Sequence, residues 1–121
     1  MSHTKIGLLI SPDLFFTSKV TGTAHALGLR VESIDDVTTA AARLSSGDVA
    51  CVLFDLGAPR ASITNLFAAL PASARIPVIA FGSHVNVELL EAAQAAGAEV
   101  MPRSQFASTL PDILKKHLGA S

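Results

Sequence analysis

Asp55 is the residue whose type and position first suggest chemistry. It ends the apolar run Cys51–Phe54 of the segment CVLFDLGAP, and Gly57 and Pro59 follow closely. A carboxylate that ends a buried strand beside a turn stands at the edge of a sheet, where open α/β folds bind their ligands. Asp55 therefore either takes part in chemistry or only ends a strand.

Common motifs for nucleotide, zinc and hydrolase sites are absent from the sequence. The first apolar run leads into Ser-Pro-Asp, Ser11 to Asp13, where a phosphate-binding loop would need glycines. The histidines have no partner at metal-ligand spacing, and no C-x-x-C, H-E-x-x-H or G-x-S-x-G occurs. Ser83 and His84, with Asp55, leave a Ser/His/Asp hydrolase or a small-molecule site as an alternative, although no oxyanion site accompanies them.

Short apolar runs alternate with longer, alanine-rich segments of helical period, and this alternation must position those residues. It is typical of a parallel sheet whose strands are joined by crossover helices. Five such pairs predict a doubly wound α/β sandwich of three layers, a five-stranded parallel sheet flanked by five helices. The predicted strands are Ile6–Ile10, Arg30–Ile34, Val49–Leu56, Pro77–Phe81 and Glu99–Met101. The second is short and alternating, which suits an edge strand.

Capping residues predict where the first helix begins and ends. Ser11 is expected to cap it, with Pro12 in the first helical position and Asp13 near the positive end of the helix dipole. Gly28 is expected to end it. Its predicted buried stripe is Phe16, Val20, Ala24 and Leu27.

The other four helices are predicted from similar signals. Asp35 and Asp36 are expected to cap the second helix, not to hold a metal, and Gly47 to end it. The last helix is expected to begin near Ser108 or Thr109, because Pro111 belongs in a first turn. The remaining expectations are a second helix that buries Val37, Ala41 and Leu44, a third over Ile63–Leu70 closed by Pro71, a fourth over Val87–Ala96 between Asn86 and Gly97, and a fifth that buries Leu110, Ile113, Leu114 and Leu118.

The composition predicts one cytoplasmic globular domain, residues 1–121. Half of the residues are hydrophobic and 16% are charged, so the chain can bury a substantial core. With a net charge of -1 and no basic patch, neither nucleic acid nor a membrane surface is an expected partner. No signal peptide or membrane span is recognisable, and the single Cys51 is expected to be a buried thiol in a reducing compartment.

The candidate site is the edge where the parallel strands end, because ligands of such folds bind outside the carboxyl ends of the strands. Four short segments meet this condition. They are Ser11–Asp13, Asp55–Pro59, Gly82–His84 and Arg103–Ser104.

Three segments together resemble the receiver domain of bacterial response regulators, the CheY-like phosphoacceptor domain. They are VACVLFDLGAP, RIPVIAFGS and AAQAAGAEVMPRSQF, and the resemblance covers essentially the whole chain. The sharpest piece is the apolar strand that ends in Asp55, with Pro59 four residues later. The resemblance implies a flavodoxin-like fold in which the residue at Asp55 accepts a phosphoryl group from a histidine kinase, while Mg²⁺ neutralises the charge.

The residues that the resemblance implies as helpers are replaced here. The acidic pair after the first strand falls on Ser11 and Pro12, with Asp13 one position late. Because the missing pair would supply both charge and metal ligands, we expect poor metal affinity and no resident metal, with Asp13 and Asp55 as weak candidate ligands.

The residues that sense the phosphoryl group in that family are replaced too. The hydroxyl position after the fourth strand falls on Gly82, next to Ser83. The lysine position after the fifth strand falls on Ser104, next to Arg103. Successive strand residues point to opposite faces, so Arg103 is expected to act as a substitute cation only if a bulge or the break at Pro102 turns it inward.

These replacements favour a degenerate receiver, or pseudo-receiver, that is not an enzyme. It is expected to bind another signalling protein, a histidine kinase or an output protein, with weak or absent phosphorylation. The binding surface, or the interface of a homodimer, would be the fourth helix, fifth strand and fifth helix. Candidate contacts there are Val85, Val87 and Met101.

The alternative keeps the chemistry. In it, the chain is a single-domain receiver phosphorylated on Asp55 by a histidine kinase in a two-component phosphorelay. Asp13, Asp55 and a backbone carbonyl near Gly57 would then hold Mg²⁺.

Overall fold

The computed structural model describes residues 5–34, 37–45, 47–57, 63–70, 76–83 and 87–119. Strands and helices alternate along the chain as predicted, so the predicted α/β fold is confirmed. The strands are β1 Ile6–Ile10, β2 Val31–Ile34, β3 Val49–Asp55, β4 Val78–Gly82 and β5 Glu99–Pro102. The helices are α1 Leu14–Ala26, α2 Val37–Leu44, α3 Ile63–Ala69, α4 Val87–Ala96 and α5 Arg103–Leu118.

The five strands form one parallel sheet in the order β2-β1-β3-β4-β5. β2 lies at an edge of the sheet, as predicted, and its residues are only partly buried or exposed. From β1 the chain first adds β2 on one side of the sheet and then β3 on the other, so the direction of strand addition reverses between β1 and β3. Ligands of such folds bind in a crevice at this switch point. This topology places the end of β1 beside the end of β3.

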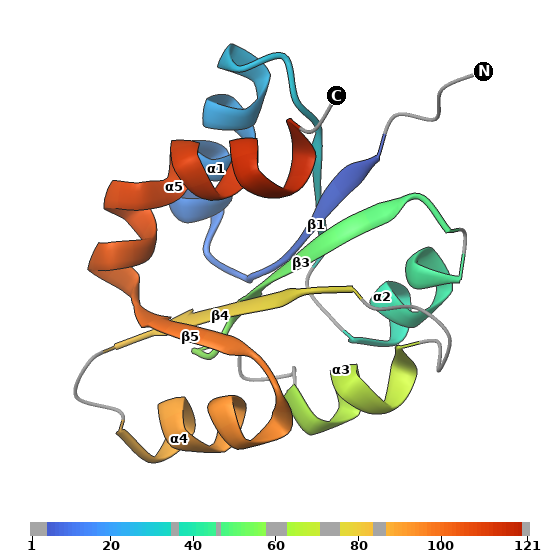
Figure 1. Ribbon diagram of the computed structural model, residues 1–121, viewed down its shortest axis with the longest axis vertical. Helices are drawn as coiled ribbons and strands as arrows, with labels where there is room; N and C mark the ends of the chain where they lie inside the picture. Colours follow the sequence, from blue (N-terminus) through green and yellow to red (C-terminus); the bar gives the residue numbers. More distant parts are fainter. Residues whose placement is uncertain are drawn as a thin grey trace.

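Helices cover both faces of the sheet (Figure 1). α1 and α5 pack on one face, where side chains such as Leu9, Leu53 and Phe81 join their apolar stripes. α2, α3 and α4 contribute to the core on the other face, with Leu8 and Phe54 of the sheet. Successive strand residues supply opposite cores, which is why the strands read as continuous apolar runs. The result is the predicted three-layer sandwich.

α1 begins later than predicted and has a different cap. Its first residue is Leu14, and Asp13 is the cap, because the Oδ1 atom of Asp13 accepts a hydrogen bond from the Phe16 amide at 3.1 Å. Pro12 therefore precedes the helix, and the Ser11 side chain is not the cap. The predicted stripe is confirmed, with Phe16, Val20 and Ala24 buried and Leu27 partly buried against the same core.

α5 begins at Arg103, five residues before the predicted start near Ser108, so that prediction is wrong. Pro111 lies inside the helix, where a missing N–H and a steric clash cost about 3 kcal/mol. Phe106 and Leu110 are 0% and 1% exposed, and burial of each contributes about 1.5–3 kcal/mol. Packing of this apolar stripe on the sheet therefore outweighs the proline.

The ends of the other helices agree in part with the predictions. Gly28, Gly47 and Gly97 follow α1, α2 and α4 with φ of 74°, 85° and 115°, a region in which glycine is favoured. In α2, Ala40 and Leu44 are buried while Ala41 is only partly so. The predicted caps and stops Asp35, Asp36, Pro71 and Asn86 lie outside the described residues.

Cys51 is a buried thiol, as predicted. Its side chain is 0% exposed in β3, and burial raises its pKa to about 12. A thiol with this pKa is almost wholly protonated at neutral pH and is a poor nucleophile. Cys51 therefore contributes packing and not chemistry.

His117 in the last turn of α5 predicts a pH dependence of stability. Burial and the charge of Lys116 lower the pKa of this imidazole below 6.5, although Glu99 acts in the opposite direction. The unfolded chain therefore takes up the proton first, so the free energy of unfolding should fall as pH drops through about 6.5 and level off below the folded-state pKa. His117→Asn should flatten this part of the profile in urea unfolding.

The matched control for that prediction is His25→Asn on the exposed side of α1. It removes a solvent-exposed imidazole and leaves His117 in place. A profile that keeps its full slope in His117→Asn would contradict the assignment to His117.

Candidate functional site

The candidate site lies at the carboxyl ends of β1, β3 and β4 and at the start of α5. Ser11 follows β1, Asp55 ends β3, Gly82 ends β4 and Arg103 begins α5 directly after β5. Parallel strands end at one edge of the sheet, so residues from four distant parts of the chain converge here. The predicted location of the site is therefore the place where these residues meet.

Asp55 is buried, and internal donors satisfy its carboxylate. It is 1% exposed. Its Oδ1 atom accepts hydrogen bonds from the Gly57 amide at 2.8 Å and from Nη2 of Arg103 at 2.9 Å, and its Oδ2 atom accepts one from the Ser11 hydroxyl at 2.7 Å. A buried charge needs such partners because its desolvation is costly. Both oxygens are thus engaged within the chain.

Ser11 and Asp13 form the β1 side of the site. Ser11 is 5% exposed, and its hydroxyl accepts a hydrogen bond from the Asp13 amide at 3.2 Å while it donates to Asp55. Asp13 uses Oδ1 as the cap of α1, and its Oδ2 lies 3.9 Å from Nη1 of Arg103. Ser11 is therefore a neutral donor to Asp55, in a position where the resemblance implies a second carboxylate.

Arg103 brings a positive charge to the site. Its guanidinium bonds to Asp55 and lies 5.0 Å from the ring centroid of Phe16 and 5.5 Å from that of Phe81. Because β5 ends at Pro102 and α5 begins at the next residue, strand alternation does not govern where Arg103 points. The condition stated for Arg103, a break at Pro102 that turns it inward, is thus met.

The aromatic rings under Arg103 are not among the predicted site residues. Phe81 stacks on Phe106 with ring centroids 4.2 Å apart, and Phe16 lies 4.9 Å from Phe81. Sequence patterns mark all three as core residues, and no local signal shows that a cation covers Phe16 and Phe81. The contact of these two rings with Arg103 depends on the packing of α1 and α5 on the same face of the sheet.

The glycines of the site leave little room for larger side chains. A Cβ atom on Gly57 would lie 3.2 Å from Oδ1 of Asp55. A Cβ atom on Gly82, which is buried, would lie 3.2 Å from Cβ of Leu56. Leu56 thus closely approaches the position where the resemblance implies a hydroxyl residue.

Ser83 and Ser104, two of the other predicted site residues, are both exposed, and neither is among the described donors to the Asp55 carboxylate, which are Ser11, Gly57 and Arg103. Pro59 and His84 lie outside the described residues, so the Ser83–His84–Asp55 trio cannot be assembled from the described part of the chain.

The residues around Asp55 do not fit the Mg²⁺ ion that the resemblance implies. Magnesium needs near-octahedral oxygen ligands, usually with one or two carboxylates. Here the oxygens of Asp55 already accept from Ser11, Gly57 and Arg103, and a guanidinium lies between Asp55 and Asp13. Within the described ranges, no three His, Cys, Asp or Glu residues are grouped as metal ligands.

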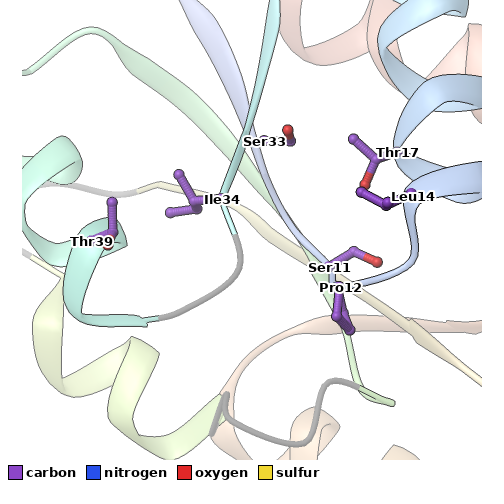
Figure 2. Close-up of a pocket in the computed structure, with 7 residues that line it drawn as sticks. All are labelled: Ser11, Pro12, Leu14, Thr17, Ser33, Ile34 and Thr39. Carbon is purple, nitrogen blue, oxygen red and sulfur yellow. The ribbon is translucent and has the colours of Figure 1, made fainter.

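Open clefts flank the closed carboxylate. One of about 430 Å³ lies between α1 and β2, with Ser11 and Pro12 at its base, Leu14 and Thr17 on one side, and Ile34 and Thr39 on the other (Figure 2). Another of about 620 Å³ borders the exposed side of Arg103, and its other lining residues are Phe16, Lys19, Gly82, Ser83, Pro102, Ser104 and Ala107. Solvent therefore reaches the surroundings of Asp55 but not the carboxylate itself.

Comparison with known proteins shows which fold the chain has. No protein-family model and no curated protein sequence matches the chain. Among solved structures, the phosphorylated cyanobacterial phytochrome response regulator RcpA is similar over 98% of each chain, with a TM-score of 0.78 and 17% identity. A signal receiver domain from Bermanella marisrubri is similar over 95% of this chain and 98% of its own, with the same TM-score and identity.

NtrX from Brucella abortus, solved in complex with ATP, is also similar. The match has a TM-score of 0.77 and 17% identity, and it covers 97% of this chain but only 27% of NtrX. Because the sequence identities are this low, the structural similarity establishes the fold alone. The chain has the fold of response regulator receiver domains.

Proposed function

We propose that the chain is a degenerate receiver that signals by binding another protein, and that Asp55 is not an efficient phosphoacceptor. The observation that carries this proposal is the engagement of both Asp55 oxygens by Ser11, Gly57 and Arg103. A nucleophilic carboxylate must present a free oxygen in line with the leaving group of the phosphodonor. Asp55 is also 1% exposed, so a phosphodonor can reach either oxygen only if the residues around the carboxylate move.

The charges of the site also oppose phosphoryl transfer. Bringing a phosphoryl dianion within about 4 Å of a carboxylate costs roughly 1 kcal/mol per charge pair in water and about 4 kcal/mol at an effective dielectric constant of 20. A divalent cation would offset this cost, but the residues present do not fit one. Arg103 carries a single charge, which Asp55 already neutralises at 2.9 Å.

A phosphoryl group on Asp55 would also meet few groups able to sense it. Gly82 has no side chain, and Ser104 is exposed on α5, so neither can replace the hydroxyl and lysine that the resemblance implies. Both absences support a module whose surface does not depend on phosphorylation.

The test is incubation with Mg²⁺ and a small phosphodonor such as acetyl phosphate, followed by intact-mass measurement. We expect no phosphoryl adduct on the wild-type chain. Asp55→Asn is the matched control, since it removes the acceptor and keeps the shape of the side chain. An adduct on the wild type that is lost in Asp55→Asn would instead establish the alternative, a receiver phosphorylated on Asp55.

The partner in this proposal is another signalling protein, such as a histidine kinase or an output protein. Val87 and Leu89 on α4 are 54% and 41% exposed, which supports α4 as part of the docking surface or of a homodimer interface with β5 and α5. Met101 is only 7% exposed, so its expected role as a contact is wrong: it packs in the core beneath α1 and α5. Val85 lies outside the described residues.

A second exposed apolar pair lies at the start of α1, beside the site. Leu14 is 80% exposed and Phe15 is 91% exposed. Large apolar side chains that are adjacent and this exposed are typical of protein contacts. The proposal therefore includes the start of α1 as well as α4.

The proposal also includes a cytoplasmic location. The thiol of Cys51 is free and buried, as is common in reducing compartments. In the part of the chain that the structure describes, no helix has the length and apolar character needed to cross a membrane.

A further inference from the structure

We infer that Arg103 takes the place of the divalent cation that the resemblance implies, as a cation built into the chain that holds the start of α5 on Asp55 without metal. This inference deepens the proposed function and rests on it. It makes two claims: the wild-type site excludes divalent cations, and removal of the guanidinium exposes a latent cation site between the Asp13 and Asp55 carboxylates.

The position of the guanidinium carries the first claim. Nη2 lies 2.9 Å from Oδ1 of Asp55, and Nη1 lies 3.9 Å from Oδ2 of Asp13. These two nitrogens face the two carboxylates that would be the acidic metal ligands of the site. Oδ2 of Asp13 is not used by the α1 cap, which takes Oδ1. One planar cation therefore bridges both carboxylates.

The core holds Arg103 in this position. The guanidinium lies over Phe16 and Phe81 at 5.0 and 5.5 Å from the ring centroids, distances at which cations are attracted to aromatic faces. Arg103 is the first residue of α5. The Phe106 side chain of the same helix is 0% exposed, and its burial fixes the start of α5 on the sheet. A rigid planar fork on a fixed backbone loses little entropy when it binds a carboxylate, unlike a lysine ammonium on a flexible stem.

Electrostatic repulsion from the guanidinium weakens the binding of a divalent cation beside it. A single positive charge about 4 Å from a divalent cation repels it even at the dielectric constant of water. This repulsion weakens binding of the divalent cation by more than about tenfold. Arg103 also engages Oδ1 of Asp55 directly. Removal of its charge should therefore both free a ligand oxygen and end the repulsion.

The test uses Mn²⁺, whose unpaired electrons broaden the NMR signals of nearby amides. Mn²⁺ is titrated into the ¹⁵N-labelled chain while the Gly57 amide is followed, since this amide donates to Asp55. In wild type we expect no selective broadening of Gly57. In Arg103→Met, which keeps an apolar stem over the rings, we expect it at a Mn²⁺ concentration at least about tenfold below the highest one at which wild type shows none.

Two control variants make the result specific. Lys19→Met removes a nearby exposed cation that has no ion pair among the described residues, and it should behave like wild type. Asp13→Asn in the Arg103→Met background should lose the gained broadening, because Asn keeps the capping ability but not the charge. Selective broadening of Gly57 in wild type at the same Mn²⁺ concentration as in Arg103→Met would overturn the inference, as would no gain in Arg103→Met.

The outcome is separable from that of the phosphorylation assay. If wild type excludes Mn²⁺ and Arg103→Met binds it, the inference stands even where a phosphodonor labels Asp55 in wild type, and only the proposed lack of phosphorylation fails. If wild type binds Mn²⁺ at Asp55 without being phosphorylated, the inference fails while the degenerate receiver stands.

Discussion

Arg103→Met is expected to lower the free energy of unfolding by about 2 kcal/mol at neutral pH without divalent cations. Breaking a fully buried ion pair costs about 3–5 kcal/mol, because the remaining charge stays buried without its partner. Asp55 is 1% exposed, but the side chain of Arg103 is 36% exposed, so solvent screening reduces the effect. Urea unfolding monitored by circular dichroism measures the change.

A double-mutant cycle with Asp55→Asn shows whether the ion pair is the cause. If it is, Arg103→Met should cost less in the Asp55→Asn background by at least about 1 kcal/mol. Lys19→Met, which removes an exposed cation that lines the same cleft, should stay within about 0.5 kcal/mol of wild type. An equal cost of Arg103→Met in both backgrounds would mean that the arginine stem, and not its charge, stabilises the fold.

Phe81→Ala is expected to be more destabilising still, by about 4 kcal/mol. The ring is 0% exposed, stacks on Phe106 at 4.2 Å and lies under the Arg103 guanidinium. Its loss leaves a cavity where α1 and α5 meet the sheet, and it also removes one of the two rings that hold Arg103. We therefore expect both a lower free energy of unfolding and a changed chemical shift of the Gly57 amide.

Phe54→Ala is the matched control for Phe81→Ala. Phe54 is 1% exposed in the core on the other face of the sheet, away from Arg103. It should lose similar stability but leave the Gly57 amide shift close to that of wild type. Phe81→Leu extends the comparison if Phe81→Ala does not fold, and an unchanged Gly57 shift in both Phe81 variants would show that the rings do not position Arg103.

The contrast between Ser11 and Asp13 shows where local patterns are insufficient. Both residues have the chemistry of a helix cap, and the sequence alone favours Ser11 because Pro12 follows it. In the fold, the Ser11 hydroxyl instead donates to Asp55, 44 residues away, and Asp13 takes the cap. The choice depends on which residue lies beside β3, and local sequence does not contain that information.

The start of α5 shows the same limit. A proline is a strong local signal, and Pro111 predicts a helix start near Ser108. The helix instead begins at Arg103, because Phe106 is buried against Phe81 and Phe16. The residues next to Pro111 in the sequence give no sign of this contact. The position of Arg103 over Asp55 follows from this earlier start, which is why the cation of the site was predicted only under a condition.

The sequence by itself determined the α/β class, the order of the strands and helices along the chain, the edge position of β2 and the place of Asp55 at the end of β3. These follow from the period of apolar residues and from glycines, which are properties of neighbouring positions. Only the tertiary structure decided that Ser11 and Arg103 satisfy the Asp55 carboxylate. Hydrogen bonds between residues as many as 48 positions apart depend on strand order and helix packing, and the folded chain alone brings those residues together.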